Sequence, residues 1–315
     1  MIEVKNLTKR YGQHYAVNDI SFTVNDGEIL GFLGPNGAGK TTTMNIITGY
    51  IAATEGDVVV NGVDILAEPE KAKAKIGYLP DAPPLYNEMK VDEYLRFVAD
   101  IKKVKPRDRV KMINEIKETV RITDMSNRLI KNLSKGYKQR VGLAQAMMGY
   151  PEIIIMDEPT IGLDPKQIIE MRDVIKRLGK KHTVILSSHI LQEVSAVSDH
   201  IMIISSGKIK TNDSIEHLSS KQSHGNTMGV RVKGEEARVL SALENYPVIK
   251  KVTPAGSQEP GTIDLELTGD EDVDIREAIF SCMSKNNFPI LQMKSMNPTL
   301  EEIFMQVTGG EGGEY

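Results

Sequence analysis

Apolar and polar positions change their periodicity several times along the chain. Residues 2–11 and 19–34 alternate at first and then run continuously apolar, which predicts strands passing from the edge of a sheet into its core. Between 84 and 150 the apolar residues recur at intervals of three and four, the spacing of amphipathic helices. We therefore expect a β-rich N-terminal subdomain followed by a helical insertion.

Strand patterns return after the insertion and alternate with a helical one. Apolar runs occupy 152–159, 182–189 and 199–210, while 165–180 has the periodicity of a helix. Strands that alternate with helices are typical of a mostly parallel sheet covered by helices. The pattern thus predicts an α/β fold for a first domain, residues 1–218.

A polar stretch, 219–226, has no periodic apolar face and is predicted to be a linker to a second domain at 227–309. The order of elements in that domain is strand, helix, two strands, helix, strand and a closing helix. This order predicts a small α+β sandwich of the ferredoxin-like type. Because the domain has no obvious catalytic cluster, we expect it to mediate dimer contact or regulation. The glycine-rich residues 310–315 are predicted to form a flexible tail.

Composition narrows the class of protein. The 315 residues, 40% of them hydrophobic, suffice for two domain cores, and a single cysteine, Cys282, excludes an intramolecular disulfide framework. The first residues lack the apolar region of a signal peptide, and no apolar run approaches the ~20 residues that cross a bilayer. We expect a cytoplasmic protein whose membrane role, if any, depends on a partner.

Charge argues against a nucleic-acid partner. The formal net charge is −4, whereas proteins that wrap nucleic acid usually present a broad basic face. The densest basic stretch, 102–111, is interpreted as a solvated helix junction broken by Pro106. A place near lipid headgroups or a partner loop is the alternative.

A glycine-rich segment follows the apolar run that ends near residue 33. Its Gly34, Gly39, Lys40 and Thr41 have the G-x-x-x-x-G-K-[ST] spacing of a phosphate-binding loop, and a helix is predicted to follow. Glycines without Cβ let backbone N–H groups converge on phosphate oxygens at the positive end of that helix. Lys40 is expected to reach the β and γ phosphates, and Thr41 to hold Mg²⁺. The predicted ATP-binding residues of this loop are Gly34, Pro35, Asn36, Gly37, Ala38, Gly39, Lys40, Thr41 and Thr42.

Two acids end the apolar strand predicted at 153–156. Asp157 is expected to hold Mg²⁺, and Glu158, which points elsewhere on an extended chain, is expected to polarise the attacking water. Taken alone, the pair could simply cap a strand before Pro159. Together with an upstream phosphate loop, the pair predicts ATP hydrolysis.

With these motifs the sequence resembles the ATP-binding subunits of ABC transporters over essentially its whole length. Residues 133–140, LSKGYKQR, are similar to the family signature LSGGQ, and 162–165, GLDP, to the D-loop. The resemblance implies that the signature crosses to the ATP of a second copy and that Asp164 communicates between the two sites. The implied signature residues are Ser134, Lys135, Gly136 and Gln139. Helix capping is the alternative for LSKG, whereas in GLDP capping by Asp164, with Pro165 at the first helical position, and the D-loop role can hold together.

The resemblance also assigns three single residues. His189 matches the switch histidine that contacts the γ-phosphate, Tyr11 the aromatic that stacks on adenine, and Val17 a contact near the sugar and base. A structural histidine and a tyrosine that closes an edge strand are the ordinary alternatives.

Two positions depart from the family pattern. Asp81 stands where the family commonly has glutamine; it can coordinate Mg²⁺ or its waters, but adds negative charge and donates no hydrogen bond when ionised. Lys135 stands where the signature often has glycine, and either brings a cation near the phosphate of the second copy or faces solvent.

The signature, the acid after YLP and the C-terminal NPTLEEIFMQVTG resemble the ATPase subunits of ABC-2 type exporters, such as drug-export and gliding-motility types. This implies ATP and Mg²⁺, a separately encoded membrane (permease) subunit, and a homodimer or heterodimer of ATPase subunits at the inner face of the membrane. An importer ATPase, a soluble ABC ATPase acting on ribosome or DNA, and a regulatory module without turnover are the alternatives.

Overall fold

The computed structural model describes residues 1–214, 227–243, 246–270, 273–296, 302 and 304–305. The described residues form two compact units, one within 1–214 and the other within 227–305. The predicted linker (219–226), the tail (310–315) and most of the predicted closing helix lie outside the described residues. No described helix is both long and apolar enough to span a bilayer.

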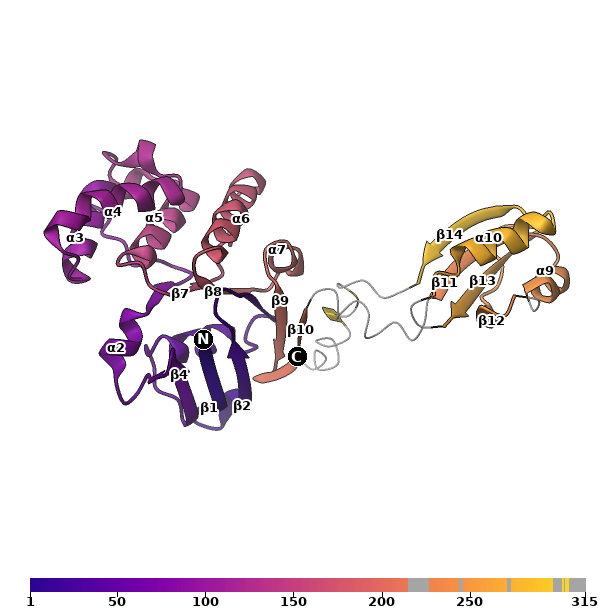
Figure 1. Ribbon diagram of the computed structural model, residues 1–315, viewed down its shortest axis with the longest axis horizontal. Coiled ribbons are helices and arrows are strands. Elements are labelled where there is room, and N and C mark those ends of the chain that lie inside the picture. Colours follow the sequence, from indigo (N-terminus) through magenta and orange to yellow (C-terminus); the bar gives the residue numbers. More distant parts are fainter. Residues whose placement is uncertain (215–226, 244–245, 271–272, 297–301, 303, 306–315) are drawn as a thin grey trace. The chain divides into compact units, whose positions relative to one another are not determined.

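Two sheets form the frame of the first unit (Figure 1). The outer sheet has the order β2-β1-β4-β5 and is antiparallel. Its strands are β1 (Ile2–Tyr11), β2 (His14–Val24), β4 (Glu55–Val60) and β5 (Val63–Asp64). The central sheet has the order β10-β9-β3-β8-β7-β6 and is parallel except for β10, as the strand and helix alternation predicts. Its strands are β3 (Ile29–Leu33), β6 (Ile76–Leu79), β7 (Ile153–Asp157), β8 (Thr183–Ser188), β9 (His200–Ser205) and β10 (Lys208–Ser214).

Helices pack on the central sheet and form the insertion. The sheet-associated helices are α1 (Lys40–Ile47), α2 (Pro69–Ala74), α6 (Pro165–Gly179) and α7 (Leu191–Ser195). The insertion contains α3 (Val91–Ile101), α4 (Pro106–Thr119), α5 (Lys135–Met147) and the 3₁₀ turns Thr123–Met125 and Ile130–Asn132. Pro106 starts α4, so the basic stretch is a helix junction, as expected.

The surroundings of strand β7 explain why its residues 153–156 are all apolar. Ile153 and Ile155 belong to the core between the two sheets, whereas Ile154 and Met156 belong to the core shared with the helical insertion. Because successive side chains of a strand point to opposite faces, a strand covered on both sides needs an unbroken apolar run. The same burial on both faces places the end of β7 deep in the domain.

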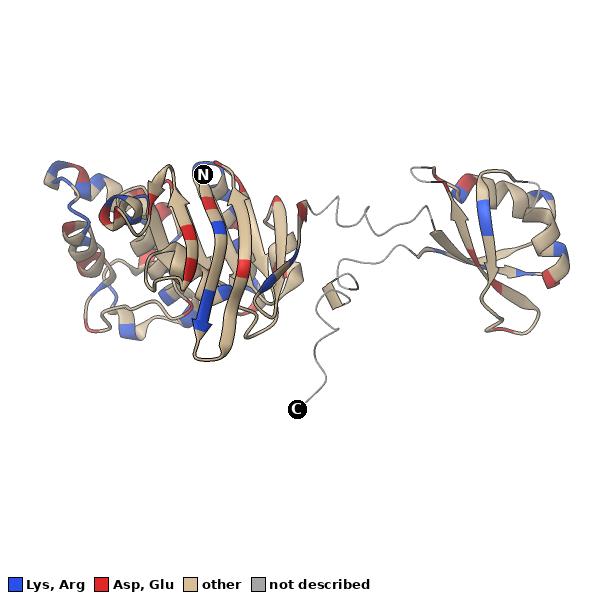
Figure 2. Cartoon of the chain, turned by 90° about the horizontal axis from the view of Figure 1, so that it is seen from below, with Lys and Arg blue, Asp and Glu red and all other residues tan. Residues whose placement is uncertain are grey.

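The second unit has the order β12-β13-β11-β14, all antiparallel, which is the ferredoxin-like arrangement predicted from its element order. Its elements are β11 (Thr227–Lys233), α9 (Glu236–Leu243), β12 (Ile249–Pro254), β13 (Thr262–Gly269), α10 (Arg276–Lys285) and β14 (Ile290–Ser295). Cys282 is buried in the core of this unit with its Sγ 3.3 Å from the Ala242 carbonyl oxygen. In Figure 2 basic and acidic residues are interspersed over the ribbon of each unit.

Candidate functional site

Four neighbouring parallel strands end at one edge of the central sheet, and each leads into a predicted functional segment. The glycine-rich loop follows β3, His189 follows β8, Glu158 follows β7, and Asp81 comes soon after β6. The carboxyl ends of parallel strands are the usual place for a ligand in an α/β sheet. Strand order therefore gathers four segments that are far apart in the sequence.

The loop 34–39 is held tightly between β9 and β2. A Cβ atom at Gly34 would lie 2.3 Å from the Ile204 carbonyl oxygen, and one at Gly39 would lie 2.4 Å from the Ala16 carbonyl oxygen. Gly37 and Gly39 also have positive φ values of 79° and 108°. Only glycine meets these requirements without displacement, so the backbone has a fixed path into α1.

The Lys40 side chain lies inside this loop. Its ammonium donates to the carbonyl oxygens of Gly34 (2.7 Å) and Pro35 (3.1 Å). Oε1 of Glu158 lies 3.4 Å from the same nitrogen, and Lys40 is buried. A buried ammonium needs such partners, and phosphate oxygens can take their place.

Glu158 connects the loop to His189. Its carboxylate Oε2 lies 3.0 Å from His189 Nδ1, while Oε1 faces Lys40, and the residue is 9% exposed. The backbone at Glu158 has a φ of 48°, an unusual value outside glycine, and its N–H donates to Ser187 Oγ. Left-handed backbone at a non-glycine residue costs of order 1–3 kcal/mol, and such strain is common at functional sites. The structure thus brings together three predicted catalytic side chains.

Oxygen atoms that suit Mg²⁺ lie at the same edge. Asp157 is buried at the end of β7 and accepts a hydrogen bond from Ser187 Oγ, and Thr41 is exposed in the first turn of α1. Carboxylate and hydroxyl oxygens are ligands that Mg²⁺ accepts, so these residues fit the ion. Within the described part of the chain, no cluster of three His, Cys, Asp or Glu residues can hold a metal by itself.

Asp81 follows β6, and no printed contact joins its side chain to Lys40, Glu158 or His189 among the described residues. Its backbone oxygen accepts a 2.7 Å hydrogen bond from Gln139 Nε2, while its side chain is exposed. Burial, with smaller contributions from the negative charges of Asp157 and Asp81, raises the pKa of the Tyr78 hydroxyl. Tyr78 therefore stays a hydrogen-bond donor, and it contacts Oδ1 of Asn45 on α1 at 3.1 Å.

The signature segment and the D-loop segment both begin helices. Ser134 caps α5 by accepting from the Tyr137 N–H, and Asp164 caps α6 by accepting from the Gln167 N–H at 2.9 Å. A Cβ atom at Gly162 would lie 2.6 Å from Lys135 Nζ, so Lys135 lies along that turn. The predicted capping roles are confirmed, and both capping residues are exposed.

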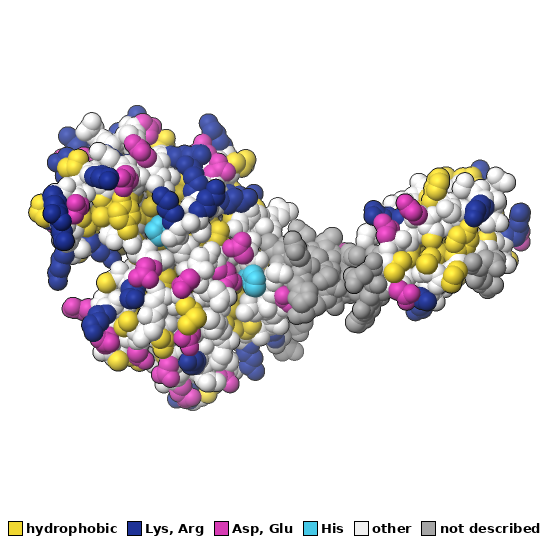
Figure 3. Space-filling view, viewed as in Figure 1, with side chains coloured by type: hydrophobic (Ala, Val, Ile, Leu, Met, Phe, Trp, Pro, Cys, Tyr) yellow, Lys and Arg dark blue, Asp and Glu magenta, His cyan; other side chains and the backbone are white. Residues whose placement is uncertain are grey.

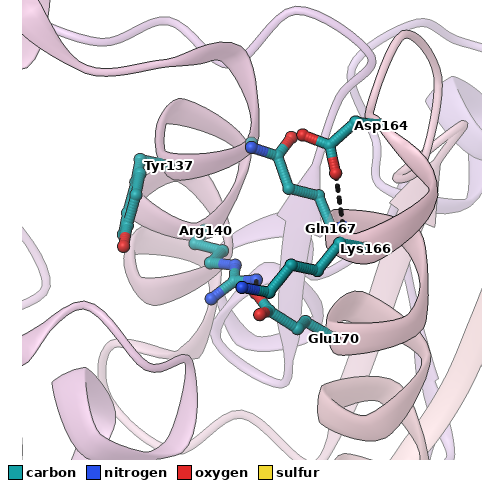
Figure 4. Close-up of a pocket in the computed structure, with 7 residues that line it drawn as sticks. Tyr137, Arg140, Asp164, Lys166, Gln167 and Glu170 are labelled. Atoms are coloured by element: carbon teal, nitrogen blue, oxygen red, sulfur yellow. Dashed lines mark hydrogen bonds and ion pairs between the residues drawn. The ribbon is translucent and has the colours of Figure 1, made fainter.

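A pocket of about 210 Å³ lies where α5 faces α6 (Figure 4). Arg140 on α5 and Glu170 on α6 form an ion pair across it. A Cβ atom at Gly136 would lie 2.5 Å from Gln167 Oε1, so the two helices approach closely. Gln139 is only 1% exposed and bonds to Asp81 of its own chain. In this structure Gln139 faces inward, unlike the exposed Ser134.

Tyr11 and Val17 occupy different environments. Tyr11 ends β1 with 53% of its surface exposed, and the Lys9 ammonium lies 5.2 Å from its ring centroid. Val17 is fully buried, and its Cγ2 lies 3.5 Å from the position of a Cβ at Gly39. Val17 therefore supports the loop from the core in this structure, whereas the Tyr11 ring is exposed with the Lys9 ammonium over it.

Within the described residues, no hydrogen bond or ion pair joins Ser134, Lys135 or Asp164 to the Lys40, Glu158 and His189 group. Several hydrogen-bonded polar residues of this domain were not predicted from the sequence: Asn45, Tyr78, Thr160, Ser187, Ser188 and Glu193. The signal for two of them was present, because Ser187 and Ser188 are polar residues that end an otherwise apolar strand.

Comparison with known proteins adds independent evidence. The sequence matches the family model described as ABC transporter over residues 17–161. The linearmycin resistance ATP-binding protein LnrL of Bacillus subtilis is 31% identical over 98% of this chain and 98% of its own length. The bacitracin transport ATP-binding protein BcrA of Bacillus licheniformis is 37% identical over 70% of this chain and 72% of its own. A post-hydrolysis dimer of the ATP-binding cassette MJ0796 with ADP and Pi is 26% identical, covers 68% of this chain and 99% of its own, and has a TM-score of 0.63.

Proposed function

The chain belongs to the ATP-binding proteins of ABC transporters, and on this premise we propose that it is the motor subunit of an ABC-2 type exporter. Membership confirms the predicted P-loop ATPase fold and ATP hydrolysis. The similarity to LnrL, a linearmycin resistance protein, and to BcrA, a bacitracin transport protein, supports export. The contacts of Glu158 with Lys40 and His189 are the observation that carries the mechanism.

In the proposed reaction, Glu158 accepts a proton from the attacking water. Its Oε2 is held by His189, and its Oε1 becomes available when Lys40 turns from it toward the β and γ phosphates. His189 fixes the carboxylate and, through its other ring nitrogen, contacts the γ-phosphate. General-base catalysis of this kind contributes typically about 10²–10⁴ in rate.

Thr41 and Asp157 would hold Mg²⁺, with Asp81 contributing through the waters of the ion. When bound, the ion neutralises charge on the β and γ phosphates. Since the described residues contain no cluster that holds a metal alone, we expect the ion to bind together with the nucleotide.

The proposed motor closes as a head-to-tail dimer with ATP between the two copies. The exposed Ser134 and the N-terminus of α5 would then face the γ-phosphate of the other copy, because a helix N-terminus beside a hydroxyl group can bind an anion. The similar MJ0796 cassette forms a dimer in its post-hydrolysis structure with ADP and Pi. The second unit is proposed to add a dimer contact or regulation, and removal of residues after 223 with unchanged dimerisation, ATPase rate and partner coupling would refute this.

The membrane subunit is proposed to dock on the exposed ring of Tyr86, which packs on the buried Tyr94 and the partly buried Phe97. The Tyr86 ring lies 5.9 Å from that of Tyr94 and 5.2 Å from that of Phe97, yet 54% of Tyr86 is exposed. Hydrophobic side chains gather over the helical insertion on the face shown in Figure 3. Tyr86 lies five residues after Asp81 in the sequence, so a movement of the Asp81 segment on nucleotide binding would be transmitted to a partner that contacts Tyr86.

The hydrolysis mechanism is tested with purified protein, ATP and Mg²⁺. Glu158→Gln should abolish turnover and accumulate an ATP-bound dimer, measured by phosphate release and light scattering. Glu152→Gln is the matched control, because Glu152 precedes β7 as Glu158 follows it, and its carboxylate is exposed. Equal turnover by the Glu158→Gln variant and the wild type would refute the assignment of the base.

Export is tested by purifying the chain from detergent-solubilised membranes and reconstituting it with the membrane protein that copurifies. ATP-driven release of substrate from the ATPase side supports an exporter. Uptake toward the ATPase side would instead identify an importer, and copurification with ribosomes or DNA would identify a non-transport ATPase.

A further inference from the structure

Among the described residues, one buried carboxylate has no role in the proposed mechanism. Glu193 on α7 is 6% exposed, and its Oε2 accepts a hydrogen bond from Thr160 Oγ1. Ser188 Oγ lies 3.5 Å from the same oxygen. Burial of a carboxylate is costly unless hydrogen bonds compensate, so this arrangement needs a physical reason.

The two hydroxyl donors belong to the two segments that carry the catalytic pair. Thr160 comes two residues after Glu158, and Ser188 comes immediately before His189. Both hydroxyl residues are buried. One oxygen of Glu193 therefore links the two backbones whose side chains meet at the 3.0 Å contact between Glu158 and His189.

The helix that carries Glu193 is itself fixed in place. A Cβ atom at Gly31 on β3 would lie 1.9 Å from Val194 Cγ1, so α7 packs directly on the strand. The Arg172 guanidinium on α6 donates to the Gln192 carbonyl oxygen at 3.2 Å. Ser188 Oγ also accepts from the Ile190 N–H at 3.1 Å, which closes the turn that follows β8. Glu193 thus projects from a rigid support.

We propose that Glu193 is a positioning residue for ATP hydrolysis. It holds the Thr160 and Ser188 segments at the separation that keeps His189 Nδ1 bonded to Glu158, and it acts through that pair without touching the nucleotide. Hydrogen bonds from outside the reacting groups set their geometry in this way, and small misplacements reduce rates strongly. The inference rests on the ATPase mechanism proposed above.

The first measurement compares steady-state ATPase rates. Glu193→Ala and Thr160→Val should each lower kcat by about 10- to 100-fold while KM for ATP changes less than about twofold. Thr160→Ser, which keeps the hydroxyl, should restore most of kcat. In a His189→Ala background, Glu193→Ala should lower kcat little further, because the pair on which it acts is already lost. An unchanged kcat in Glu193→Ala, or an equal loss in both backgrounds, would overturn the proposal.

The second measurement does not depend on turnover. The chain has six histidines, and the ¹⁵N-histidine NMR signal of His189 can be assigned with His189→Ala. Glu193→Ala should shift the Nδ1 signal of His189, whereas Asp199→Asn should leave it unchanged. Asp199 is the control because its carboxylate accepts from the Ile29 N–H, at the far end of β3. An unshifted Nδ1 signal would overturn the positioning role, while a failure of hydrolysis in the wild type would count against the mechanism alone.

Discussion

Three glycines of the phosphate loop differ in their backbone φ and in the atoms that an added methyl group would contact. Alanine substitution at each position therefore distinguishes the free-energy cost of a steric clash from that of a left-handed backbone. Gly34 has no positive φ, but a Cβ there would lie 2.3 Å from the Ile204 carbonyl oxygen. Gly37 has a φ of +79° and no atom within 4 Å of an added Cβ. Gly39 combines a φ of +108° with a distance of 2.4 Å to the Ala16 carbonyl oxygen.

The expected losses of unfolding free energy follow from these contacts. Left-handed backbone costs alanine about 1–2 kcal/mol, and the stiffer unfolded chain returns about 0.4–1 kcal/mol, so Gly37→Ala should cost roughly 1 kcal/mol. A clash with backbone belongs at the upper end of the roughly 1–3 kcal/mol range for overpacking, so Gly34→Ala should cost roughly 2 kcal/mol. Gly39→Ala carries both costs and should lose roughly 3–4 kcal/mol.

Scanning calorimetry of the full chain without nucleotide measures these differences. The transition of the first unit should move while that of the second unit stays in place as an internal reference. Gly37→Ala as damaging as Gly34→Ala would refute the steric argument. Gly39→Ala no more damaging than Gly34→Ala would show that backbone conformation adds nothing at this position.

Three other predictions concern contacts elsewhere. Tyr86→Ala should keep the basal ATPase rate. In proteoliposomes, stimulation of that rate by the membrane subunit should fall at least about tenfold, because the exposed ring on which the partner docks is lost. Stimulation at the wild-type level would disprove that docking site. Arg140→Ala leaves Glu170 without its partner and should lower the free energy of unfolding, measured by urea denaturation, by roughly 2–3 kcal/mol. The double variant Arg140→Met with Glu170→Leu should recover most of that free energy. Equal losses of unfolding free energy in the single and the double variant would contradict this expectation. Hydrogen bonds from Arg276 lower the pKa of Asp274 to about 2, so the pair stabilises the second unit above the ordinary carboxyl pKa and is lost as pH falls through about 2. In Arg276→Gln, the pKa of Asp274 measured by NMR titration should rise toward the ordinary carboxyl value. A midpoint that stays near 2 in the variant would argue against the pairing.

Local patterns in the sequence determined most of the elements. The apolar run Ile153–Met156 predicts a strand; the structure confirms the strand and shows that it is buried on both faces. Ser134 and Asp164 are typical N-cap residues, and both cap the helices that follow them. The spacing of Gly34, Gly39 and Lys40 likewise predicts a loop between a strand and a helix. Each of these features depends on residues within a few positions of one another.

Only the tertiary structure decided which residues meet. His189 and Glu158 are 31 positions apart, and they touch because the sheet order places β8 between β3 and β7. The same order puts Glu193 behind the pair, a role that its own segment of sequence does not indicate. Val17 and Gln139 face inward for a related reason. Periodicity specifies that a face is covered, but which element covers it depends on the packing of the whole domain, and that packing decides which side chains are left to meet the nucleotide.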